Sequence, residues 1–306
     1  MAPLNRRRFL GLAAGWGAGL AVPRLALADG AALLQRRIPS SGEAIPILGM
    51  GSWFTFIVGE NRSERAIRVK VLEEFFAGGG GMIDSSPMYG SSETVIGYCL
   101  AQLPPQERLF AATKVWTQTR MLGELQMKTS ERLWGQGPLD LIQVHNLVDW
   151  ETHLETLNEW KAAGRLRYTG VTTSHGRRHR RLTALMESEP IDFVQFTYNI
   201  EDREAEKRLL PLAAERGLGV IINRPLKRGT LIDRLERNPL PDWAGEIGCA
   251  SWPQFLLKFI VSHPTVTCAI PATSNPAHMR ENLAAGRGVM PDATMRRRMV
   301  DYVLAL

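Results

Sequence analysis

The sequence has few cysteines and no hydrophobic run long enough for a spanning helix. Its three cysteines, Cys99, Cys249 and Cys268, form no C-x-x-C motif, so a metal site or a redox pair has no support. We expect buried free thiols, although an oxidising compartment would permit one disulfide. The apolar stretch at residues 10–22 contains four glycines and is too short to span a bilayer.

Two further features are missing. The glycine-rich segment 77–82 precedes an apolar run, so no strand-like run is followed by a G-x-G-x-x-G helix start. No linker rich in Pro, Gly or Ser divides the chain, which favours one domain over residues 29–306. With 44% hydrophobic and 22% charged residues the composition is globular, and 306 residues allow a large core.

The first 28 residues have the layout of an export signal. An arginine run precedes the apolar stretch, and residues 26–28 (ALA) form a small-x-small cleavage site. Residues 5–10 (NRRRFL) resemble the twin-arginine pattern. We therefore expect the twin-arginine machinery to export the chain to the periplasm, with cleavage after Ala28. An uncleaved N-terminal anchor is the alternative.

Most of the positive charge lies in this leader. Residues 1–28 contain four arginines and no acidic residue, so their removal lowers the formal charge from +6 to +2. Such a small charge argues against a nucleic-acid partner. The remaining basic run, HGRRHRR at 175–181, is expected to be a solvated helix start, with a role near a phosphate as the alternative. For the oligomeric state, a monomer is the default expectation.

Eight short apolar runs, often β-branched, recur along the chain. They are 47–53, 81–86, 109–115, 139–145, 168–173, 192–198, 218–223 and 266–272. Between them we expect helices at 63–79, capped by Ser63, and at 150–165, 204–217 and 252–264.

The alternation of strands and helices predicts a parallel sheet with crossover helices. Eight units are the number that closes a (β/α)8 TIM barrel of about 250 residues, and the segment 29–306 has 278. A doubly wound open sheet is the alternative, and the missing G-x-G-x-x-G argues against it.

Four chemically active side chains fall at the ends of successive strands. Asp84 ends the second strand, Tyr89 lies in the loop after it, and Lys114 and His145 end the third and fourth. In a barrel these ends meet at one mouth. Each residue alone is more often structural, as a salt bridge or a packed histidine, but four at successive ends favour an active site.

The four residues have a common chemical logic. A lysine cation beside Tyr89 lowers the pKa of its phenol, which makes it a better acid for a carbonyl oxygen that receives hydride at carbon. Asp84 would hold Lys114, and His145 would orient the carbonyl. No metal is required.

These segments resemble a known family. GMIDSSPMYGSSE (81–93), ATKVW (112–116) and IQVHN (142–146) are similar in order and spacing to the catalytic segments of the aldo-keto reductases, and the resemblance covers residues 36–290. It implies a (β/α)8 barrel that reduces an aldehyde or ketone with a nicotinamide nucleotide, or runs the reverse reaction. Tyr89 would be the acid, Lys114 and Asp84 its tuning pair, and His145 the orienting group.

The resemblance also implies residues that hold the nicotinamide. Thr172 and Thr173 occupy the place of the family's Ser-Asn pair, and Gln195 matches its glutamine. Asn223 and Arg224 stand where the family often has a stacking aromatic residue, and the guanidinium plane of Arg224 offers a substitute.

IPATSNPAHMRENLAA (270–285) resembles the family's adenosine-phosphate segment. Thr273 is expected at a phosphate, Glu281 and Asn282 at the adenine, and His278 and Arg280 at a 2′-phosphate. We expect NADP(H), with NAD(H) as the alternative.

Two other function classes are alternatives to a reductase. The altered positions Thr173 and Asn223 suggest a non-catalytic nicotinamide-nucleotide-binding sensor or partner subunit, which the intact set of four argues against. A secreted barrel hydrolase would need two catalytic carboxylates or a metal, and only Asp84 is well placed. Trp53, Phe54, Trp116 and the loop 226–248 suggest an aromatic, apolar wall for a small carbonyl substrate.

Overall fold

The computed structural model describes residues 31–174 and 178–306, so the predicted export signal and residues 175–177 of the basic run lie outside the described residues. Eight strands form one sheet whose neighbours are all parallel. In sheet order they are β10 (Cys268–Ala269), β9 (Gly219–Asn223), β8 (Phe193–Thr197), β7 (Tyr168–Thr172), β6 (Leu141–His145), β5 (Phe110–Val115), β4 (Met82–Asp84) and β3 (Met50–Gly51). Each of the eight predicted strands contains one of them.

The two outer strands of this sheet meet and close it into a barrel. Leu48, just before β3, forms a parallel bridge with Ala269 of β10. The Gly49 N–H donates to the Ala269 carbonyl at 2.9 Å, and the Ala269 N–H donates to the Ile47 carbonyl at 3.0 Å. The (β/α)8 barrel is therefore confirmed, and the doubly wound alternative is excluded.

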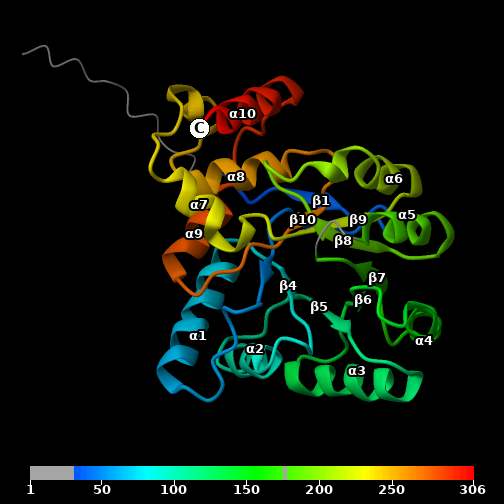
Figure 1. The fold of residues 1–306 in the computed structure, drawn as a ribbon. Coiled ribbons are helices and arrows are strands. Elements are labelled where there is room, and N and C mark those ends of the chain that lie inside the picture. Colours follow the sequence, from blue (N-terminus) through cyan, green and yellow to red (C-terminus); the bar gives the residue numbers. More distant parts are fainter. Residues whose placement is uncertain (1–30, 175–177) are drawn as a thin grey trace, which may run out of the picture.

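A ring of helices covers the outside of the barrel (Figure 1). In chain order they are α1 (Arg62–Ala77), α2 (Ser92–Leu100), α3 (Arg120–Trp134), α4 (Trp150–Ala162), α5 (His179–Ser188), α6 (Leu209–Arg216), α7 (Thr230–Leu235), α8 (Trp252–Val261), α9 (Pro276–Ala284) and α10 (Ala293–Ala305). None of these described helices is long and apolar enough to cross a membrane.

Two of the predicted helices differ from expectation at their ends. The expected cap Ser63 is wrong, because Asn61 caps α1 and its side chain accepts the Glu64 N–H at 3.1 Å. The segment predicted as one helix at 204–217 is divided into a 3-10 turn, Glu204–Glu206, and α6. Its predicted stop is confirmed, since Gly217 takes a left-handed φ of 63° that an L side chain resists.

A hairpin that the sequence analysis did not predict closes one end of the barrel. Strands β1 (Gln35–Arg37) and β2 (Ala44–Pro46) are antiparallel and lead into β3. Ile38 and Ile45 are buried in one cluster with barrel residues. The hairpin therefore covers the amino-terminal end of the strands and leaves the opposite end for the site.

The barrel interior changes from apolar to polar along the strands. Residues two apart on a strand face the same side, so Met82 and Asp84 both point inward, as do Ala112 and Lys114. The apolar members of these pairs belong to the interior cluster, and the polar members are buried above them. The carboxyl end of the barrel thus holds a buried polar layer that contains Asp84, Lys114 and His145, and Tyr89 lies in the loop that follows β4.

Candidate active site

A buried ion pair forms the centre of the site. Lys114 Nζ lies 2.5 Å from Asp84 Oδ2 and 2.7 Å from the Ser85 carbonyl. Lys114 is fully buried and Asp84 is 2% exposed. Burial alone would lower the pKa of Lys114, but Asp84 and Tyr89 raise it above its ordinary value, so the cation is maintained. The expected pairing of Asp84 with Lys114 is confirmed.

Two glutamines hold the second oxygen of Asp84. Gln195 Nε2 donates to Asp84 Oδ1 at 2.9 Å, and Gln143 Nε2 donates to the same atom at 3.2 Å. The carboxylate thus accepts from both glutamines and from Lys114, which fixes its position and stabilises its charged form. Gln143 is a residue that sequence reasoning missed. The sequence feature that could have identified Gln143 is a polar residue at an inward-facing position of an otherwise apolar strand.

Tyr89 lies beside this ion pair. Lys114 Nζ is 5.2 Å from the centre of the Tyr89 ring, and the ring of His145 meets it edge-on at 5.7 Å. Burial raises the pKa of Tyr89, and the opposing effect of Lys114 does not reverse this. The prediction of a lowered pKa is therefore wrong in its net direction, although Lys114 acts with the predicted sign. Tyr89 keeps its proton at neutral pH.

His145 is held as a neutral imidazole. Its Nδ1 lies 2.9 Å from the hydroxyl of Ser86, which itself accepts the Met88 N–H at 3.2 Å. Burial lowers the pKa of His145 to about 2, and the nearby charges of Lys114 and Arg178 act in the same direction. The Ser86 hydroxyl can donate to Nδ1, and in that arrangement the imidazole proton lies on Nε2. Sequence reasoning missed Ser86 as a partner of His145.

A group of hydroxyl and amide side chains lies at the ends of β7, β8 and β9. Asn223 Nδ2 donates to the Thr173 carbonyl at 2.9 Å, and Thr197 Oγ1 donates to Asn223 Oδ1 at 2.8 Å. Thr172 Oγ1 donates to Gln195 Oε1 at 3.3 Å. The Thr173 hydroxyl is buried and has no hydrogen-bond partner among the described residues. It is therefore available to a bound molecule, because a buried hydroxyl without a partner is costly.

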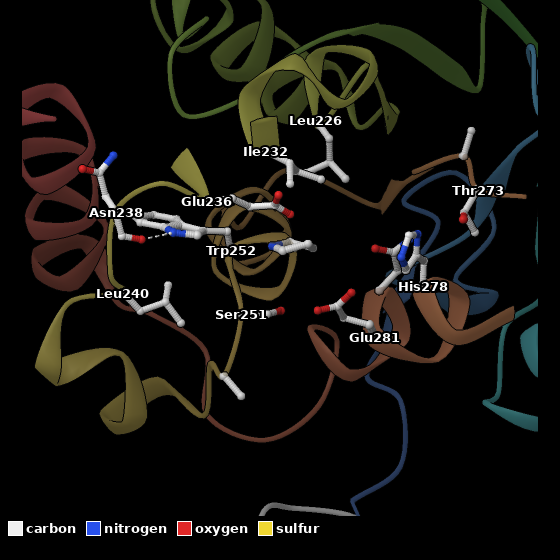
Figure 2. Close-up of a pocket in the computed structure, with 14 residues that line it drawn as sticks. Leu226, Ile232, Glu236, Asn238, Leu240, Ser251, Trp252, Thr273, His278 and Glu281 are labelled. Atoms are coloured by element: carbon white, nitrogen blue, oxygen red, sulfur yellow. Dashed lines mark hydrogen bonds between the residues drawn. The ribbon is translucent and has the colours of Figure 1, made fainter. Parts of the chain in front are cut away.

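A cavity of about 450 Å³ opens beside the end of β10. Figure 2 shows His278 and Glu281 of α9 on one side of the cavity and Trp252, at the start of α8, on the other, with Leu226 and Ile232 above them in this view. Its other lining residues are Glu236, Asn238, Leu240, Ala250, Ser251, Pro253, Ala272, Thr273 and Asn282. Four predicted cofactor residues, Thr273, His278, Glu281 and Asn282, therefore line one cavity.

Arg280 does not join them. Its side chain lies on the outer part of α9 and pairs with Glu74 of α1. In this arrangement the Arg280 guanidinium faces a neighbouring helix, and its expected contact with a 2′-phosphate stays a prediction. Sequence spacing placed it one turn after Pro276, but could not identify a partner on a helix 206 residues away.

The mouth of the barrel carries aromatic and cationic side chains. Trp53 and Tyr89 have ring centres 6.2 Å apart, and Phe54 lies 4.2 Å from Trp53. The guanidinium of Arg228 covers the Trp53 ring at 4.1 Å, and that of Arg224 lies 5.8 Å from the same ring. Arg224 therefore stacks toward an aromatic residue of the chain itself.

Comparison with known proteins decides the family. The model of the aldo/keto reductase family matches residues 47–298, which is most of the chain. The chain belongs to the aldo/keto reductase family. This agrees with the resemblance carried by Asp84, Tyr89, Lys114 and His145, which the structure brings together at one mouth.

Individual relatives are more distant. The chain is 28% identical over 258 residues to methylglyoxal reductase YeaE of Escherichia coli, covering 82% of this chain and 89% of that protein. It is 28% identical over 246 residues to pyridoxine 4-dehydrogenase of the same organism, covering 72% and 82%. A solved aldo-keto reductase of Klebsiella pneumoniae in complex with NADPH has the same fold, with a TM-score of 0.74 at 23% identity over 88% of this chain and 95% of that one.

The aldo/keto reductase site contains no group of residues suited to a metal. Among residues 31–174 and 178–306, no three His, Cys, Asp or Glu side chains come together as ligands.

Proposed function

We propose that this protein is an oxidoreductase that reduces an aldehyde or ketone to an alcohol, or runs the reverse reaction, with a nicotinamide nucleotide. The observation that carries the proposal is the buried network that joins Asp84, Lys114, Tyr89 and His145 at the barrel mouth. Family membership supports the same chemistry.

In this mechanism the protein donates a proton to the substrate oxygen, stabilises the donor after proton transfer and orients the carbonyl. Tyr89 is protonated at neutral pH and donates its proton to the substrate oxygen. Lys114 stabilises the phenolate that remains, and Asp84 keeps Lys114 in place. The neutral His145 donates a hydrogen bond from Nε2 to the same oxygen and so orients the carbonyl. A bound nicotinamide nucleotide supplies the hydride.

The side chains at the barrel mouth and in the cavity beside α9 suit the two ends of a dinucleotide, the nicotinamide and the adenosine. The unpartnered Thr173 hydroxyl, close to Thr172 and Asn223, suits a carboxamide at the barrel mouth. The cavity beside α9 offers the polar side chains of Thr273 and Asn282 to an adenosine group. We propose NADP(H) as the preferred nucleotide, with His278 as the basic cavity residue for a 2′-phosphate and NAD(H) as the alternative.

The replacement Tyr89→Phe tests the proposal directly. It keeps the ring and removes the proton donor, so we expect kcat for small aldehydes to fall by about 100-fold or more. The Kd of NADPH, measured by quenching of protein fluorescence, should change little because the ring remains. Methylglyoxal belongs in the first panel of aldehydes, since a relative is a methylglyoxal reductase. A variant that retains wild-type turnover would exclude Tyr89 as the acid.

We further propose that the protein is exported, as a monomer, by the twin-arginine route and cleaved after Ala28. The motif NRRRFL supports this route, which carries folded proteins. Because free nicotinamide nucleotides are scarce outside the cytoplasm, the nucleotide would bind before export and travel inside the barrel. Recycling it without release would then require a second substrate.

Export and loading can be tested together. The chain is expressed with its own leader, purified from the periplasm and denatured, and any released nucleotide is identified by mass spectrometry. We expect NADP(H) near one per chain, and we expect Arg6→Lys with Arg7→Lys to leave the protein in the cytoplasm. Periplasmic protein that is uniformly free of nucleotide would contradict loading before export.

A further inference from the structure

Three arginines surround the catalytic residues without an acidic partner. Arg224 and Arg228 lie against Trp53, and Arg178 donates to the Asn146 carbonyl beside His145. None of the three forms an ion pair with an acidic side chain in the part of the chain that the structure describes. They differ in this from their neighbours, since Lys227 and Arg234 both pair with Glu201 at 2.6 Å.

The loop after β9 holds two of these arginines in an unfavourable backbone conformation. Arg224 has a φ of 49° and Arg228 a φ of 62°, both in the left-handed region. Such a conformation is unfavourable for a residue with a side chain, and it is found most often at functional sites. Lys227 between them has a similar φ of 47°. Both guanidinium groups lie beside the Trp53 ring at the mouth.

The charge of the mouth is therefore unbalanced. Asp84 is already neutralised by Lys114 at 2.5 Å, and His145 is neutral. Burial raises the pKa of Tyr89 and Arg224 opposes this rise, whereas burial and then the charge of Arg228 lower the pKa of Arg224. A cluster of guanidinium groups beside the proton donor is suited to an anion with two oxygens.

We propose that Arg224 and Arg228 bind an anionic group of the substrate, so that the preferred substrates are aldehydes or ketones that carry a carboxylate. This inference rests on the proposed carbonyl reduction. The carbonyl would face Tyr89 while the carboxylate is held at the arginines, on the Trp53 side of the mouth. The alternative anion for the same two arginines is the diphosphate of the nucleotide.

The test compares 4-formylbenzoate with its neutral counterpart 4-formylbenzamide. The kcat/KM of each is measured with NADPH for the wild type, Arg224→Gln, Arg228→Gln and the control Arg234→Gln. The control removes a cation from the same segment, but one that pairs with Glu201, which keeps Lys227 as its partner. Circular dichroism confirms that each variant is folded.

We expect the wild type to prefer the carboxylate, and we expect Arg224→Gln to reduce that preference about 10-fold or more, as loss of a charge-assisted hydrogen bond predicts. Arg228→Gln should reduce it in the same direction, and Arg234→Gln should match the wild type. The Kd of NADPH, measured separately by fluorescence, should change much less than the preference.

Two results would overturn the inference. An unchanged preference in both variants would show that the arginines do not bind the substrate. An equal fall for both aldehydes, with weaker NADPH binding, would assign the arginines to the diphosphate. In either case turnover of the neutral aldehyde leaves the proposed reduction intact, whereas a wild type that reduces neither aldehyde removes both proposals together.

Discussion

At the scale of single residues, the hydroxyl of Ser86 determines what His145 can do. The Ser86 oxygen accepts the Met88 N–H and lies 2.9 Å from His145 Nδ1, so a proton that Ser86 donates to Nδ1 holds the imidazole in the tautomer with its proton on Nε2. An orienting donor requires this tautomer. Ser86 is a positioning residue that acts through His145.

We predict that Ser86→Ala lowers kcat by about 10-fold, because an imidazole without its partner populates both tautomers and rotates more freely. Nitrogen NMR of labelled histidine supplies the independent readout. The wild type should show one neutral tautomer at His145 from pH 5 to pH 8, since its pKa is lowered to about 2, and the variant should show a mixture. The same single tautomer in both proteins would argue against the assigned role.

At the scale of elements, a buried carboxylate joins α2 to β5 and α3. Glu93 of α2 is 2% exposed and accepts from Thr113 at 2.5 Å, Ser130 at 2.8 Å and the Trp134 indole at 3.1 Å. Burial raises its pKa, and these three donors oppose the rise. Glu93 is the last residue of the GMIDSSPMYGSSE segment, so this motif combines a catalytic part with a structural anchor.

We predict that Glu93→Ala lowers the free energy of unfolding by about 3 kcal/mol or more, because it leaves three buried donors without an acceptor. The matched variant Glu93→Gln should cost about 1 kcal/mol or less, since its amide can accept from Thr113 and Trp134 and donate to Ser130. Urea unfolding followed by circular dichroism measures both changes. Equal losses in the two variants would contradict the role assigned to these hydrogen bonds.

These elements also indicate what the sequence can predict. The strand positions and the inward placement of Asp84 and Lys114 were predictable, because alternation puts Met82 with Asp84 and Ala112 with Lys114 on one inward face. Side-chain partners on elements far apart in the sequence were not predictable, as the ion pair between Arg280 and Glu74 illustrates. The net direction of the Tyr89 pKa was also missed, because it depends on burial that only the packed barrel determines.

At the scale of the whole molecule, the three cysteines are buried free thiols, as the sequence analysis expected. Burial raises the pKa of Cys99 and of Cys249 to about 12 and also raises that of Cys268. The reactive thiolate is therefore scarce at neutral pH, and access is blocked.

We predict that Ellman's reagent finds almost no reactive thiol in the native protein and three per chain after denaturation without a reductant. The count in denaturant is the decisive measurement. One thiol instead of three would reveal a disulfide that the described structure does not contain, and a fast native reaction would contradict the burial of the cysteines.

The chain enters the hairpin of β1 and β2 at one end of the barrel, and this determines at which end the protein can be attached to a support. Leu34 donates to the Gly286 carbonyl at 3.0 Å, and Arg287 donates to the Gly78 carbonyl at 2.8 Å, so the described chain begins beside the carboxyl ends of α1 and α9. Crossover helices end at the amino-terminal face of the strands, opposite the mouth. A tether attached ahead of residue 31 would therefore immobilise the enzyme on a support with its catalytic end turned toward the solution.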